Sequence, residues 1–204
     1  MDEPRLHRAI AAIDAANADD PNTIVVGGEE RPKELAHAEM VTAWVRRLVP
    51  EPGEELLLAA RAHHLRRWTV PRSSYPEGRS AYLRWRKDLH KQHADDVGRI
   101  LEECDYGPDV TARVKDLVQK KGLGKGDAEV QALEDALCLV FIETQFREIA
   151  ERLDDQYGDP DKMVDVARKT LKKMSDGAKA FALQIDLDPR DQAIVAKALE
   201  AGAE

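Results

Sequence analysis

Hydrophobic positions recur at helical spacing along most of the chain, with polar residues between them. In residues 4–16, for example, Leu6, Ile10 and Ile13 form one apolar stripe. The periodic segments, together with the Pro and Gly residues that separate them, predict helices at about 4–16, 32–49, 53–68, 80–103, 108–122 and 127–153.

Proline and aspartate mark further helix starts. Pro160 and Pro189 each follow an aspartate, which is the pattern of an N-cap residue and a first helical position. Asp127 is in the same way suited to cap the long helix that follows it. Two stretches are not helical: NTIVVGG at 22–28 predicts a short strand or an extended loop, which alone cannot form a sheet, and 69–79 predicts an ordered loop.

Composition favours the same fold class. Of the 204 residues, 43% are hydrophobic and 34% charged, but only 5% are aromatic. Ala, Leu, Glu, Lys and Arg predominate, and all of these are strong helix formers. We therefore expect an all-α fold, a single-domain helical bundle over residues 1–204, with the helices of 160–204 packed on the core before them.

Several features indicate a cytoplasmic protein. No apolar run is long enough to span a bilayer, so no membrane partner is expected. The acidic N-terminus does not resemble a secretory signal. Cys104 and Cys138 lie far apart in helical patterns, which predicts two buried, reduced thiols.

Charge is distributed unevenly. The formal net charge of -8 argues against a general nucleic-acid binder. Residues 61–93, however, hold nine Arg or Lys against two acids, together with four of the six histidines. We call this stretch the basic segment. Aromatic residues are interleaved with its charges, namely Trp68, Tyr75, Tyr82 and Trp85.

Asp135 lies in the apolar centre of a predicted helix, next to the run from Ala136 to Phe141. Burying an unpaired carboxylate costs several kcal/mol, so this side chain needs a cation. A metal ion and an arginine of the basic segment are equally good candidates. His37 also lies on a partly apolar helix face, where a lone histidine is more often a core residue than a ligand.

The order of these residues resembles the HD superfamily of metal-dependent phosphohydrolases. The pattern consists of His37, the doublet His63-His64 in LLLAARAHHLRRW, the later His93, and Asp135 in LEDALCLVF. The resemblance covers residues 33–145 and implies an HD-like helical core in which these five side chains bind metal. His64 stands where HD proteins have an aspartate, so which histidine of the doublet binds metal is left open. Loss of that carboxylate favours metals that accept imidazole, and the candidate divalent ions are Zn, Fe, Mn and Ni.

A closer resemblance rests on the long motifs PRSSYPEGRSAYLRWRKDLHKQHAD and LEDALCLVF. Both are similar to a family known as domain of unknown function 4202, and the similarity covers nearly the whole chain. This family implies no activity, so expectations about function depend on the residues themselves.

The basic segment is suited to bind an anion. Arginine forks match phosphate oxygens two at a time, and the aromatic rings can stack on a base. The residues expected to bind substrate are Arg66, Arg67, Trp68, Arg72, Tyr82, Arg84, Trp85 and Lys87. Arg67 would also neutralise the reacting phosphoryl group, and His90 or the non-ligating histidine of the doublet, for example His64, would protonate the leaving group.

The leading hypothesis is therefore a metal-dependent hydrolase of a phosphate ester, with a nucleotide or another small phosphorylated molecule as substrate. One alternative is a non-catalytic helical module that binds a nucleotide, RNA or an acidic partner through the basic segment. A second alternative is an iron-dependent oxygenase of the HD type. A small anionic ligand is favoured over nucleic acid, and a homo-oligomer stays open.

Overall fold

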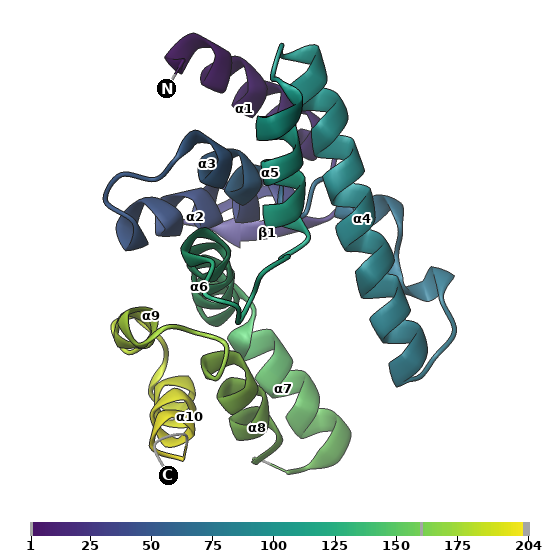
Figure 1. The fold of residues 1–204 in the computed structure, drawn as a ribbon. Helices are drawn as coiled ribbons and strands as arrows, with labels where there is room; N and C mark the ends of the chain where they lie inside the picture. The colour runs from purple at the N-terminus through teal and green to yellow at the C-terminus, as the bar shows by residue number, and fades with distance from the viewer. Residues whose placement is uncertain (1, 160, 202–204) are drawn as a thin grey trace. The chain divides into compact units, whose positions relative to one another are not determined.

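A computed structural model of the chain describes residues 2–159 and 161–201. The fold is all-α, as expected, with one short hairpin beside the helices of the described residues (Figure 1). The elements form two compact units, one up to Leu133 and one from Glu134 onward. The expected single domain, and the packing of residues 160–204 on its core, stay predictions.

The first unit is built around the central helix α3. Its elements are α1 (Glu3–Ala18), β1 (Thr23–Val26), β2 (Glu29–Pro32), α2 (Lys33–Leu48), α3 (Glu54–Ala62), the 3-10 turns η1 (Arg67–Thr69) and η2 (Arg72–Ser74), α4 (Arg79–Glu103), α5 (Pro108–Val118) and the first part of α6 (Ala128–Thr144). Helices α1, α2 and α5 all pack against α3, and α5 also lies along α4 (Figure 1). The side chains of Leu56–Ala60 are fully buried, so the middle of α3 contributes apolar contacts on all sides.

The second unit contains the remainder of α6 with α7 (Phe146–Tyr157), α8 (Asp161–Leu171), α9 (Asp176–Ala182) and α10 (Pro189–Glu200). Helix α8 packs against both α7 and α10, and buries Ala167 and Leu171. The Asp188 side chain accepts hydrogen bonds from two backbone N–H groups at the start of α10, which confirms the predicted cap before Pro189. The corresponding prediction for Pro160 lies outside the described residues.

Three predicted helices end earlier than the pattern indicated. Helix α5 ends at Val118 rather than near residue 122. Helix α3 ends at Ala62 rather than near residue 68, because the Arg66 N–H donates to the Asn17 side chain instead of to a carbonyl within the helix. The segment predicted as one helix to residue 153 is two helices, which separate at Gln145 (φ -119°, ψ -11°). The fully buried ring of Phe146 begins the second one.

The segment NTIVVGG forms a strand that pairs with the residues directly after it. β1 and β2 are antiparallel, with Val26 opposite Glu29. Gly27 and Gly28 have φ of 61° and 86°, which only glycine adopts at little cost and which a two-residue hairpin turn requires. The charged sequence of β2 hid this pairing from the hydrophobic pattern. The hairpin leads directly into the first turn of α2.

The remaining features agree with the sequence. The side chains of Cys104 and Cys138 are both buried, and within the described residues neither forms a disulfide bond. Within the described residues, no helix combines the length and the apolar character that crossing a bilayer requires.

Asp127 caps α6 and pairs with Arg113, and its removal should destabilise the fold. Its carboxylate accepts from the N–H groups of Glu129 and Val130 and from both Arg113 amino groups. The Arg113 hydrogen bonds, opposed by partial burial and helped by the backbone donors, lower its pKa to about 2. We expect Asp127→Ala to lower the free energy of unfolding at pH 7 by about 1–2 kcal/mol in urea denaturation.

The pH dependence of this contribution follows from the depressed pKa. The folded protein binds the Asp127 proton more weakly than the unfolded chain does, so the stabilisation is complete above about pH 4 and declines as pH falls towards 2. The control Asp127→Asn keeps a capping oxygen and loses the charge. Its stability should fall less steeply than that of the wild type over this range, and an identical slope would contradict the assignment.

Candidate metal centre

Glu34 and His37 face the same side of the first turns of α2, because residues three apart on a helix are neighbours. Both side chains are buried. The backbone of Glu34 is held by Asp20, whose Oδ2 accepts from the Glu34 N–H at 3.0 Å. The hairpin and the end of α1 therefore determine where this carboxylate lies.

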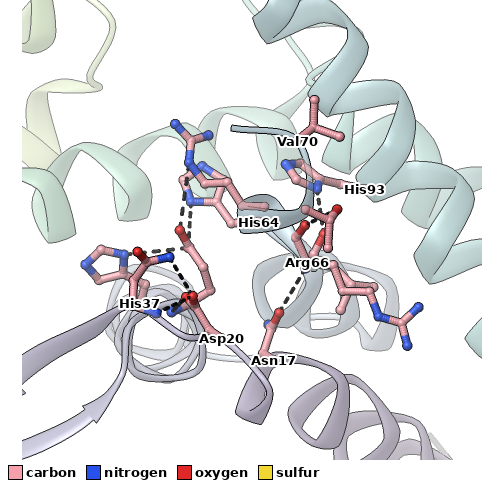
Figure 2. Close-up of polar contacts among 12 residues, drawn as sticks. Asn17, Asp20, His37, His64, Arg66, Val70 and His93 are labelled. Atoms are coloured by element: carbon pink, nitrogen blue, oxygen red, sulfur yellow. Dashed lines mark hydrogen bonds and ion pairs between the residues drawn. The ribbon is translucent and has the colours of Figure 1, made fainter. Parts of the chain in front are cut away.

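His64 approaches the same carboxylate from the turn that follows α3. Its Nδ1 lies 3.1 Å from Glu34 Oε2, and Nδ1 of His37 lies 3.7 Å from that oxygen (Figure 2). One ligand atom from each of Glu34, His37 and His64 lies within 4.8 Å of the others. We call these three residues the metal cluster, since the group could hold a metal ion.

The geometry and donor types fit a transition metal. Ligand atoms about 2.0–2.1 Å from a tetrahedral ion lie roughly 3.3 Å from each other, which is close to the two distances in the cluster. Two imidazoles and one carboxylate are a donor set that zinc and iron accept. Glu34 was not among the predicted ligands, although the spacing Glu34-Leu35-Ala36-His37 is a signal that could have identified it.

His63 and His93 flank His64. Their ring centroids lie 4.3 and 5.9 Å from that of His64. Nδ1 of His63 lies 2.9 Å from the carbonyl oxygen of Ala60, and Nδ1 of His93 lies 2.8 Å from that of Leu65. Since only a protonated nitrogen donates to a carbonyl, Nε2 of each neutral ring carries a lone pair. Nε2 of His93 is buried and has no hydrogen-bond partner among the described residues.

Burial keeps these flanking imidazoles neutral. It lowers the pKa of His63 to about 3 and that of His93 to about 4, although their carbonyl partners oppose the shift. For Glu34, burial alone would raise the pKa, but the charge of His64 and the hydrogen bonds from His37 and His64 hold it well below its ordinary value. Metal binding requires an ionised carboxylate, and the lowered pKa keeps Glu34 in that form.

Asp135 belongs to the second unit. Its two carboxylate oxygens accept hydrogen bonds from the backbone N–H and the hydroxyl group of Ser175, at 2.9 and 2.6 Å. Both predicted roles of this carboxylate, as a metal ligand and as the partner of an arginine, stay predictions.

Arg67 connects the metal cluster to the basic segment. Its Nε lies 3.8 Å from Glu34 Oε1, and its guanidinium lies over the Trp85 ring at 4.9 Å. Trp85 is fixed in turn, because its ring N–H donates to the Val70 carbonyl. The Tyr82 ring follows at 5.8 Å from Trp85, on the solvent side of α4. The structure thus brings Arg67, Trp85 and Tyr82 into one row that begins at Glu34.

The other predicted substrate residues have separate contacts. Arg72 donates to the Tyr75 carbonyl, and the guanidinium of Arg84 lies 5.8 Å from the Tyr75 ring. Arg66 and Lys87 are exposed. Trp68 and His90 are half-buried, and their roles stay predictions.

Arg61, the first cation of the basic segment, has an ordinary structural partner. It forms two hydrogen bonds with the Asp14 carboxylate, at 2.5 and 2.7 Å, and a longer one with Glu39. This residue therefore contributes its charge to an ion pair of the chain itself.

The fold and the cluster define an all-α protein with a partly buried histidine–carboxylate centre next to an arginine. The family model described as "Domain of unknown function (DUF4202)" matches residues 7–195, and the chain belongs to this family. Neither a curated protein nor a solved structure matches the chain. The likeness to the HD superfamily stays a prediction.

Proposed function

We propose that this protein is a metal-dependent hydrolase that acts on a phosphate ester of a small molecule. One observation supports this most strongly: the Arg67 guanidinium lies beside the carboxylate that His37 and His64 also approach. Metal ligands next to an arginine fork can place a phosphoryl group between two kinds of positive charge.

Each residue of the centre has a separate role in this proposal. A bound divalent ion supplies Lewis-acid activation and a water of lowered pKa. Glu34, His37 and His64 hold that ion, and Arg67 orients a phosphoryl oxygen and neutralises its developing charge. The Trp85 ring under the guanidinium restricts Arg67 to one side of the cluster.

The first test is elemental analysis of protein purified without a metal-chelating tag. We expect about one equivalent of zinc, iron or manganese, lost on dialysis against a chelator. Phosphate release from nucleoside mono-, di- and triphosphates and from sugar phosphates should require that metal and return on its addition. No activity on any of these compounds in the metal-loaded protein would count against the hydrolase.

Replacing Arg67 by lysine keeps the positive charge but removes the planar guanidinium, so it tests which of the two the reaction needs. We expect Arg67→Lys to lower kcat/KM by about 100-fold or more, because an ammonium group cannot bind two phosphoryl oxygens in one plane. Affinity for the metal should change little, since the positive charge next to Glu34 is kept. Arg46→Lys, on the exposed side of α2, is the control. Equal activity of the two variants would remove Arg67 from the mechanism.

The donor set also favours a second candidate. Two histidines and one carboxylate form the triad that non-haem iron oxygenases use. An oxygenase would purify with iron, and it would consume oxygen when its substrate is added. Iron-loaded protein that releases phosphate without consuming oxygen would exclude this candidate.

A further inference from the structure

The turn at the end of α1 contains two buried polar residues that face different segments of the site. Asn17 is fully buried and Asp20 nearly so, and a backbone hydrogen bond from Asp20 N–H to Asn17 O joins them. We call residues 17–20 the α1 end turn. Asp20 accepts from the backbone N–H of Glu34 and Asn17 from that of Arg66, so both side chains bond to the backbone near the metal cluster rather than to its ligand atoms.

Asn17 holds the turn that carries His64. Its Oδ1 accepts from the Arg66 N–H at 3.1 Å (Figure 2). Arg66 has a φ of 53°, a left-handed conformation that is unfavourable for a residue with a side chain. From the opposite side, the His93 ring donates to the Leu65 carbonyl. The two contacts hold the backbone between His64 and Arg67 in a shape that it would otherwise avoid.

Asparagine is energetically unfavourable at position 17 if the residue only fills space in the core. Its Nδ2 is buried and has no hydrogen-bond partner among the described residues. An amide with an unpaired donor is less favourable in a core than an apolar side chain of similar size. The residue therefore contributes through its oxygen, which accepts, among the described residues, from the Arg66 N–H.

Asp20 holds the other side of the site. Its Oδ1 accepts from the backbone and side-chain N–H groups of Asn22, and its Oδ2 accepts from the Glu34 N–H. The carboxylate thus joins the end of α1 to the first turn of α2, across the hairpin. Glu34 and His64 are thirty positions apart in sequence, yet the backbones of Glu34 and of Arg66, two residues after His64, are hydrogen-bonded to the same four-residue turn.

We infer that the α1 end turn is the positioning element of this site: Asn17 and Asp20 set the separation of His64 and Glu34 before any metal arrives. This rests on the proposed metal site. Hydrogen bonds to the residues that carry the ligands keep a metal site ordered before the ion binds. Binding then loses less conformational entropy, so the affinity is higher. Asn17 and Asp20 are positioning residues, because they act through His64, Arg67 and Glu34.

The test measures Co²⁺ binding to the full chain from its visible absorption spectrum, with Asn17→Ala as the main variant. We expect its affinity to fall by about tenfold or more, the range that supporting hydrogen bonds show in metal sites. Adding Arg66→Gly should restore most of the affinity, because glycine adopts the left-handed conformation without help. Ile13→Val, a change in the buried core of the same helix, should bind Co²⁺ as the wild type does.

Two results would overturn the inference. One is unchanged affinity and an unchanged spectrum in Asn17→Ala. The other is a loss that Arg66→Gly does not restore or that Ile13→Val shares, since either would indicate general destabilisation. Restoration by Arg66→Gly alone supports the inference, because a packing role would not respond to that change.

Amide hydrogen exchange of the metal-free chain separates this inference from the proposed function. The Arg66 amide should be protected in the wild type and should exchange about tenfold faster, or more, in Asn17→Ala. If the wild type binds no Co²⁺, the proposed metal-dependent function is wrong. Protection of the Arg66 amide would still support the role of Asn17 in holding the backbone at Arg66. If Asn17→Ala does not fold, the exchange rate of the Arg66 amide in the wild type is the test. An Arg66 amide that exchanges as fast as the amide of exposed Ser73 would overturn the inference.

Discussion

Replacing Glu34 by glutamine should lower the affinity of the protein for Zn²⁺ by about 100-fold or more. Glutamine has nearly the same size, so the change removes the negative charge and one oxygen donor but leaves the packing of α2 intact. Supporting residues around a metal site already contribute ten- to 100-fold, and a direct ligand should contribute at least the upper value. Competition with a chromophoric chelator measures the affinity.

The matched control is Glu39→Gln on the same helix. Glu39 pairs with Arg31 and Arg61 at the surface of α2, so it shares the charge of Glu34 but not its surroundings. The control should bind Zn²⁺ as the wild type does. Equal affinities for the wild type and Glu34→Gln would remove Glu34 from the centre, and equal losses in both variants would indicate an effect of net charge.

Changing the two histidines of the doublet separately should give different losses. His64→Ala removes the imidazole that faces Glu34, so metal binding and metal-dependent phosphate release should fall by about 100-fold or more. His63→Ala should leave metal affinity within about tenfold of the wild type, because the ligand atoms that come together in the described residues belong to Glu34, His37 and His64. Its main effect should be a loss of stability of about 2–3 kcal/mol, since the ring is buried.

Zinc titration and urea denaturation of the same two samples give both quantities. A larger loss of metal affinity in His63→Ala than in His64→Ala would reverse the assignment and make His63 the ligand. This experiment therefore answers a question that the sequence left open.

The doublet illustrates why the sequence could not assign the ligand. On a helix continued to residue 68, His63 and His64 would project about 100° apart, and either could face the centre. The structure ends α3 at Ala62, and the side chain of Asn17 takes the N–H that a longer helix would have used. The direction of His64 thus depends on a residue 47 positions earlier, which no local pattern includes.

Glu34 was missed for a related reason. An acidic residue in the first turn of a helix is ordinary, because it interacts favourably with the helix dipole. It becomes notable only when His64 and Arg67 arrive beside it from another segment. Similarly, the sequence showed the excess of positive charge in residues 61–93 but not which of these cations belong to the site. Arg61 pairs with Asp14, whereas Arg67 lies next to the metal cluster.

By itself, the sequence determined the all-α class, most helix boundaries, the caps at Asp127 and Asp188, and the burial of both cysteines. These depend on apolar periodicity and on the local hydrogen bonds of Pro, Gly and Asp, which act over a few residues. Only the tertiary structure decided that Glu34 joins His37 and His64, and that Arg67 faces them. Those contacts depend on where separate segments cross, and the side chains that fix the crossing, Asn17 and Asp20, lie in neither segment.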